Sequence, residues 1–255
     1  MIRLLALLLA LAAPPAAAFD ALRDATIDAR PGATIPLDRP FRDESGRRVT
    51  LAELADGRPI VLAPVLHDCP NICDVSLAGL AQAIGGQSYR PGRDFALVAF
   101  GIDPKETPET AAASLDRLRG AFPGLGPITG LTGAAPDIAA VTEALGYRYA
   151  WDPDIGEYAH ISAAAVLTPD GRLAAWLRGI APEPADLRLA LTDAGQGKLG
   201  SWGDQILLLC YHYDPKTGEY GSIVTTLLRA GGVATAGGGA LLIGLALWRE
   251  RRRRP

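Results

Sequence analysis

The sequence of 255 residues is poor in the residue types that build metal and redox sites, with one methionine, three cysteines and three histidines. The methionine is Met1, which is expected to be removed together with an N-terminal signal peptide. The mature protein therefore cannot form a metal site that needs a thioether ligand. Any soft metal site or reactive thiol must use the cysteines Cys69, Cys73 and Cys210.

The chain also lacks an excess of positive charge, because its formal net charge is −3 at pH 7. Arginines at positions 249 and 251–254 gather at the C-terminus, so the rest of the chain is more acidic than the net charge indicates. This distribution argues against a nucleic-acid partner. Beside an apolar segment, an arginine cluster is better explained as a topology signal and a contact for lipid headgroups.

Both ends of the chain indicate export and membrane attachment. Arg3, an apolar stretch at residues 4–13 and alanines at 16–18 are typical of a cleavable signal peptide. Residues 230–248 are apolar or small and long enough to cross a bilayer, and the arginines that follow predict a cytoplasmic end. A buried core helix is the alternative, but each glycine in this run would cost about 1 kcal/mol in a soluble helix.

These expectations place the main domain in the periplasm of a bacterium, held at the inner membrane by a single C-terminal span. The stretch between signal peptide and span has the length of one domain with a sizeable core. The expected parts are a signal peptide (1–18), a folded domain (19–200), a juxtamembrane segment (201–229), a transmembrane helix (230–248) and a cytoplasmic basic tail (249–255).

Hydrophobic patterning within the domain predicts alternating strands and helices, which is typical of an α/β fold. A Pro-Asp-Gly turn at residues 169–171 separates two apolar runs and predicts a β-hairpin. We expect strands at 60–66, 95–102, 128–131, 163–167 and 173–180, and helices at 75–84, 108–122, 137–145 and 183–194.

The most informative motif is Cys-Pro-Asn-Ile-Cys at residues 69–73, between the first predicted strand and the first predicted helix. Unpaired N–H groups at a helix start lower the pKa of a thiol and favour the thiolate. Three residues separate the cysteines, instead of the two in a thioredoxin-type Cys-x-x-Cys motif, and an i, i+4 offset on a helix suits chelation of one soft ion. A structural disulfide is the alternative, although so short a loop would stabilise the fold little.

Together with two further motifs, this one gives the chain a resemblance to the Sco/SenC family of copper chaperones for cytochrome c oxidase assembly. One is the acidic loop Ile-Asp-Pro-Lys-Glu-Thr-Pro at residues 102–108, and the other is Tyr-Ala-His-Ile-Ser at residues 158–162, just ahead of the hairpin. The resemblance implies a thioredoxin-like fold, in which helices flank a central sheet.

The resemblance also implies a copper site with Cys69, Cys73 and His160 as ligands. Two thiolates and one imidazole form a soft site that suits Cu(I) and can also accept Cu(II). Asp103 and His67 are weaker candidates for residues that orient these ligands. Many relatives carry proline after the second cysteine, whereas this chain carries an aspartate, whose negative charge should raise the thiol pKa values.

The function implied by the resemblance is delivery of copper to the dinuclear copper A site of cytochrome c oxidase subunit II, through stepwise ligand exchange at the membrane. This role requires no catalytic turnover, and other copper chaperones are further candidate partners. The alternative is an enzyme, a thiol–disulfide reductase that uses Cys69 and Cys73 to keep the oxidase cysteines reduced. A peroxidase of the peroxiredoxin class suits the fold, but Thr107 and Arg119 are not placed to support it.

Cys210 and His212 lie between the domain and the apolar run. In a strand, a Cys-x-His pair points to one face, so the two residues are candidates for an auxiliary metal contact. A half-buried strand at the membrane surface is the simpler interpretation, and an unpaired thiol could also form an intermolecular disulfide. Asp-Pro-Lys-Thr-Gly at residues 214–218 predicts a turn directly afterwards.

Overall fold

The structure of the protein is a computed structural model. It describes residues 24–28, 30, 32–68, 73–154, 156–195, 211–214, 219–222, 231–239 and 243. For residues 73–74, 211–214 and 219–222 it describes the backbone alone. The predicted signal peptide and basic tail lie outside the described residues.

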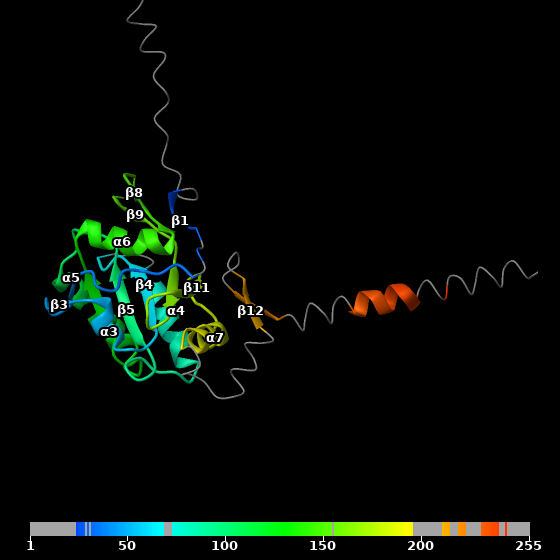
Figure 1. The fold of residues 1–255 in the computed structure, drawn as a ribbon. Helices are drawn as coiled ribbons and strands as arrows, with labels where there is room; N and C mark the ends of the chain where they lie inside the picture. The colour runs from blue at the N-terminus through cyan, green and yellow to red at the C-terminus, as the bar shows by residue number, and fades with distance from the viewer. Residues whose placement is uncertain are drawn as a thin grey trace, which may run out of the picture.

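Strands and helices alternate along the folded domain (Figure 1). In chain order the elements are β1 (Thr26–Ile27), β2 (Phe41–Asp43), β3 (Arg48–Val49), α3 (Leu51–Ala55), β4 (Ile60–Val65), α4 (Cys73–Gly85), β5 (Ala96–Gly101), α5 (Pro108–Ala121), β6 (Thr129–Thr132), α6 (Ala135–Leu145), β7 (Tyr147–Arg148), β8 (Ala150–Asp152), β9 (Glu157–Ala159), β10 (Ala163–Leu167), β11 (Leu173–Arg178), α7 (Pro184–Ala194), β12 (Tyr211–Asp214) and β13 (Glu219–Ser222).

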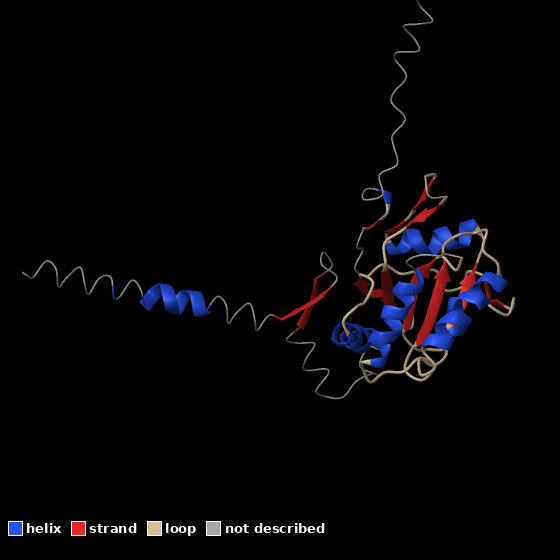
Figure 2. Cartoon of the chain, turned by 180° about the vertical axis from the view of Figure 1, so that it is seen from behind, coloured by secondary structure: helices blue, strands red, loops and turns tan. Residues whose placement is uncertain are grey.

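A seven-stranded sheet with the order β11-β10-β4-β5-β6-β2-β3 forms the centre of the domain (Figure 2). Strands β4, β5 and β6 are parallel, whereas β10 and β11 on one side and β2 and β3 on the other are antiparallel. Every residue of β4 and β5 is buried. Strands buried on both faces are expected where helices cover both sides of a sheet.

The two faces of the sheet carry separate hydrophobic clusters. Val61 and Ala63 of β4 pack into the cluster that contains the apolar faces of α4, α5 and α7. Ile60 and Leu62 alternate with them and pack into the cluster under α3 and α6. Successive strand residues point to opposite faces, so this alternation produces a three-layer arrangement of helices, sheet and helices.

The predicted elements after residue 60 are confirmed, with shifts of a few residues at their ends. The hairpin of β10 and β11 is confirmed, and Gly171 takes a φ of +83° that suits glycine at the turn. The described part of helix α4 begins at Cys73, two residues before the start that the pattern predicts. Sequence patterning gave no element before residue 60, where β2 and β3 extend the sheet and Thr50 caps α3.

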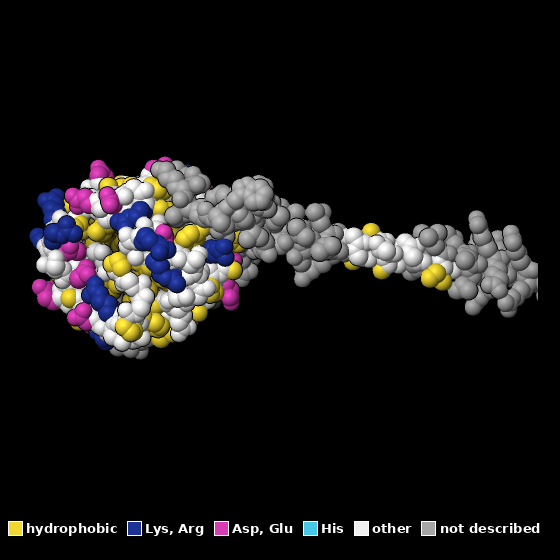
Figure 3. Space-filling view, turned by 90° about the horizontal axis from the view of Figure 1, so that it is seen from below, with side chains coloured by type: hydrophobic (Ala, Val, Ile, Leu, Met, Phe, Trp, Pro, Cys, Tyr) yellow, Lys and Arg dark blue, Asp and Glu magenta, His cyan; other side chains and the backbone are white. Residues whose placement is uncertain are grey.

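Part of the predicted membrane span is described, since residues 231–239 are helical. Within the described part of the chain, no helix is both long enough and apolar enough to cross a membrane. The predicted span at 230–248 reaches beyond the described residues and stays a prediction. The face in Figure 3 carries basic and acidic side chains interspersed with apolar ones, in keeping with the small formal net charge of −3.

Candidate metal centre

The cysteine motif connects the carboxyl end of β4 to the start of α4, as its position in the sequence predicts. Cys73 is the first residue of α4. The first turn of a helix has unpaired N–H groups and a partial positive charge, which favour a thiolate there. Residues 69–72 lie outside the described part of the chain, so the structure does not place the thiol of Cys69.

The loop that carries His160 meets the first turn of α4. Ser162 follows His160 by two residues, and its Oγ lies 2.8 Å from the Oγ of Ser76. Position 76 is one helical turn beyond Cys73, so the two positions lie on the same side of α4. The Oγ of Ser162 is also bonded to the carbonyl of Gly179, which fixes the segment at the start of β10. The fold therefore brings together two motifs that are almost ninety positions apart in sequence.

The imidazole of His160 is partly buried between β9 and β10. Its Nδ1 lies 3.1 Å from the hydroxyl of Tyr147 and 3.4 Å from the carbonyl oxygen of Ile161. Burial lowers the pKa of His160, and the hydrogen bond to Ile161 opposes this only in part. The lowered pKa favours the neutral form of His160, which is the form that binds metal.

His67 lies two residues before Cys69, but its side chain is turned into the domain. The imidazole is 1% exposed, and its Nε2 lies 3.1 Å from the carbonyl oxygen of Leu131 in β6. The imidazole of His67 passes close to Gly101 at the end of β5, where a Cβ at position 101 would lie 3.0 Å from Cδ2 of His67. Burial lowers the pKa of His67, so the neutral form is favoured. This geometry makes His67 a link between β4 and β6.

Glu106 supports the same junction and was not singled out by sequence reasoning. Its Oε1 accepts a hydrogen bond of 3.0 Å from the backbone N–H of Asp68, the residue before Cys69. Burial raises the pKa of Glu106 to about 7, and the carboxylates of Asp103 and Asp68 add to the rise, while backbone N–H groups of residues 67 and 68 oppose it. In the sequence, only the position of Glu106 in the acidic loop at residues 102–108 could have pointed to this role. That loop also contains Asp103, and only the tertiary contact with Asp68 distinguishes the two carboxylates.

Asp103 lies at the rim of the same region. Its Oδ1 accepts a hydrogen bond of 2.9 Å from the N–H of Lys105, which stabilises the turn of its own loop. Asp103, Asp68 and Glu106 line a pocket of about 440 Å³, together with Trp151 and Tyr158 of the hairpin of β8 and β9. Asp103 therefore lies beside the segment that leads to Cys69, with its carboxylate engaged in the loop.

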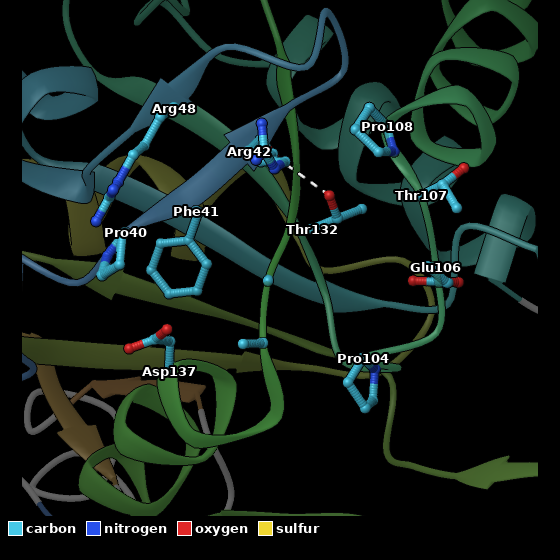
Figure 4. Close-up of a pocket in the computed structure, with 12 residues that line it drawn as sticks. Pro40, Phe41, Arg42, Arg48, Pro104, Glu106, Thr107, Pro108, Thr132 and Asp137 are labelled. Carbon is cyan, nitrogen blue, oxygen red and sulfur yellow. Dashed lines mark hydrogen bonds between the residues drawn. The ribbon is translucent and has the colours of Figure 1, made fainter.

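Glu106 also lines a second pocket (Figure 4). Its wall comes from β2, from the loop before α5 and from the start of α6, and it includes Arg42 and Asp137. The hydroxyl of Thr132 donates to the carbonyl oxygen of Arg42 over 3.5 Å. Glu106 thus lines both pockets.

Of the two auxiliary candidates, His212 belongs to the hairpin of β12 and β13. His212 belongs to β12 and pairs with Gly221 of β13, which confirms the predicted strand. Cys210 and the predicted turn at 215–218 lie outside the described residues. Within the described part of the chain, no three His, Cys, Asp or Glu side chains are grouped as for a metal ion, and the cysteine side chains do not belong to that part.

The strand order and the helix that begins at a cysteine define a class of protein. Strands β11-β10-β4-β5, with α4 between β4 and β5 and α7 at the end, form the layout of a thioredoxin-like domain. Its cysteine-bearing helix meets a histidine-bearing loop at the Ser76–Ser162 contact. The SCO1/SenC family model matches residues 31–190, and the chain belongs to this family.

Several solved structures are similar to this chain at low sequence identity. A proposed electron transfer protein from Aquifex aeolicus VF5 is 24% identical with a TM-score of 0.57, over 66% of this chain and 95% of that chain. A SCO1/SenC family lipoprotein from Bacillus anthracis is 17% identical with a TM-score of 0.50, over 67% and 99% of the two chains. Arabidopsis thaliana ScoI, solved with copper bound, is 21% identical with a TM-score of 0.48, over 66% and 96%. No curated protein sequence matches this chain significantly.

Proposed function

We propose that this chain is a copper-binding chaperone that delivers copper to the dinuclear copper A site of cytochrome c oxidase subunit II. Membership of the SCO1/SenC family supports this role. Cys69, Cys73 and His160 are the proposed ligands. Two thiolates and a neutral imidazole are soft donors in small number, which fits Cu(I) and also accepts Cu(II).

The observation that carries the proposal is the hydrogen bond of 2.8 Å between Ser162 and Ser76. It joins the loop that bears His160 to the helix that begins at Cys73. A metal ion bound by the three proposed ligands would need this meeting of the two segments. The lowered pKa of His160 also supports the proposal, because a neutral imidazole has the lone pair that a metal requires.

Transfer would proceed by ligand exchange, in which thiolates of the acceptor replace those of Cys69 and Cys73 one at a time. A membrane span at 230–248, with the domain in the periplasm of a bacterium, would raise the local concentration of this domain near a membrane-bound acceptor. Copper in this scheme is cargo, and the chain completes its task when the ion has left. Other copper chaperones would be the donors that load it.

The test is the copper stoichiometry and the ultraviolet-visible spectrum of the full-length protein, reduced and loaded with Cu(I) or Cu(II). We expect one copper per chain and thiolate-to-copper absorption in the Cu(II) form. Cys69→Ala and His160→Ala should lose or greatly weaken both. Ser88→Ala is the control, because Ser88 is exposed and lies outside the three motifs, and this variant should leave both the stoichiometry and the absorption unchanged. Equal copper retention by all variants would contradict the three-ligand site.

A thiol–disulfide reductase is the second candidate, because Cys73 at the start of α4 is placed for a reactive thiolate. One thiolate of the motif would attack a disulfide of the oxidase subunit, and the other would resolve the mixed disulfide. The oxidase cysteines would gain two electrons as Cys69 and Cys73 formed a disulfide. His160→Ala separates the candidates, since it should abolish copper binding and leave dithiol exchange intact.

A further inference from the structure

The hydroxyl of Tyr147 lies between His160 and the backbone of the next residue. Its Oη is 2.8 Å from the carbonyl oxygen of Ile161 and 3.1 Å from the Nδ1 of His160. The carbonyl oxygen can only accept a hydrogen bond, and a tyrosine hydroxyl has one proton to donate. With that proton donated to Ile161, Tyr147 offers His160 a lone pair, and only a protonated Nδ1 can bond to it.

A second contact of the same ring nitrogen agrees with this assignment. The Nδ1 of His160 lies 3.4 Å from the carbonyl oxygen of Ile161, which is again an acceptor. An N–H at Nδ1 therefore suits both the Tyr147 hydroxyl and the Ile161 carbonyl oxygen. A neutral imidazole carries one proton, so a protonated Nδ1 leaves the lone pair on Nε2.

Several contacts hold Tyr147 in place. The residue is 2% exposed, and its ring stacks on Trp176 with the centroids 5.6 Å apart and 22° between the planes. Its backbone pairs with Ile27 of β1 directly after Gly146 ends α6. At Gly146 the φ is +67°, and a Cβ would collide with the carbonyl oxygen of Asp28. The hydroxyl of Tyr147 is thus held by packing that does not involve His160.

We propose that Tyr147 is a positioning residue that selects the Nδ1-protonated tautomer of His160 and so presents Nε2 to the copper ion. The inference rests on the proposed function, because the tautomer matters for copper only if His160 is a ligand. A hydrogen-bond partner on the nitrogen that does not bind metal fixes the ring orientation of a ligating histidine. Loss of such a partner typically lowers metal affinity 10–100-fold.

The test measures the tautomer directly in the metal-free, reduced, full-length protein. The chain has three histidines, so long-range proton–nitrogen correlation spectra of protein with nitrogen-15 histidine are simple to assign. At a pH where the rings are neutral, we expect the Nδ1-protonated pattern for His160. Tyr147→Phe keeps the stacked ring and removes the hydroxyl, so it should move His160 toward the Nε2-protonated form and lower Cu(I) affinity about 10-fold.

Tyr149→Phe is the matched control. Tyr149 belongs to the same aromatic group, and its ring centroid lies 6.2 Å from that of Tyr147. This variant should keep both the tautomer and the affinity. An Nε2-protonated His160 in the unsubstituted protein would overturn the proposal without any variant, and so would an unchanged tautomer in Tyr147→Phe. Copper retention by His160→Ala would instead overturn the proposed function, because the tautomer is measured without metal.

Discussion

Ser162 and Ser76 form a hydrogen bond of 2.8 Å between the start of β10 and the first turns of α4. This bond joins the segment after His160 to the helix that begins at Cys73. The side chains are short, so the two backbones must be close. Any ligand set built from both segments depends on this contact.

We expect Ser76→Ala and Ser162→Ala to be energetically coupled. A hydrogen bond between two side chains contributes about 0.5–1.5 kcal/mol, so a double-mutant cycle of urea unfolding should give a coupling of about 1 kcal/mol. The exposed Ser88 provides the control, because Ser88→Ala and Ser162→Ala should be additive within about 0.5 kcal/mol. Additivity of the Ser76 and Ser162 pair would contradict the contact.

Gly79 should resist substitution, because α4 lies directly against the backbone after β11. A Cβ at position 79 would collide with the carbonyl oxygen of Ile180, which is backbone and cannot rotate away. We expect Gly79→Ala to destabilise the domain by about 1–3 kcal/mol in urea unfolding, the range found for overpacking. Gly120→Ala in α5 meets nothing within 4 Å and should stabilise by about 0.5–1 kcal/mol. An increase in stability for Gly79→Ala would show that the close approach is absent.

Glu106 should give the domain a pH-dependent stability. Its pKa is about 7 in the folded protein against 4.5 for an ordinary glutamate, so the folded state binds the proton more tightly. The contribution is present in full below pH 4.5 and is lost as the pH rises through about 7. Glu106→Gln stays neutral, so unfolding free energies of the two proteins should diverge across this window by up to about 3 kcal/mol. Glu109 lies on the exposed first turn of α5, so Glu109→Gln should leave the fall in unfolding free energy between pH 4.5 and about 7 unchanged.

His67 and His160 should separate stability from copper binding. His67→Ala removes a buried ring and leaves the Leu131 carbonyl without its donor, which should cost about 2–4 kcal/mol while the folded protein still binds one copper. His160 is partly exposed, so His160→Ala should lower the free energy of unfolding by about 1 kcal/mol. The same variant should lose copper. Thermal unfolding and copper titration of both variants check this. Loss of copper by folded His67→Ala would instead show that His67 orients the copper ligands.

Much of the fold could be predicted because the strands and helices after residue 60 follow local hydrophobic periodicity. Strands β4 and β5 are continuous apolar runs, and Gly171 marks the turn of the hairpin. Strand β2 has three residues and pairs with β6 far along the chain, so no local pattern announced it. Short strands of this kind are selected by pairing and packing, which a local window does not contain.

The sequence by itself determined the main elements after residue 60, the position of the cysteine motif before a helix, and the three motifs that carry the family resemblance. Tertiary structure decided the geometry between them: that His67 bonds to β6, that Glu106 holds the N–H of Asp68, and that Tyr147 faces His160. Periodicity depends on neighbours along the chain. A hydrogen bond between distant residues exists only after the sheet has brought its strands side by side.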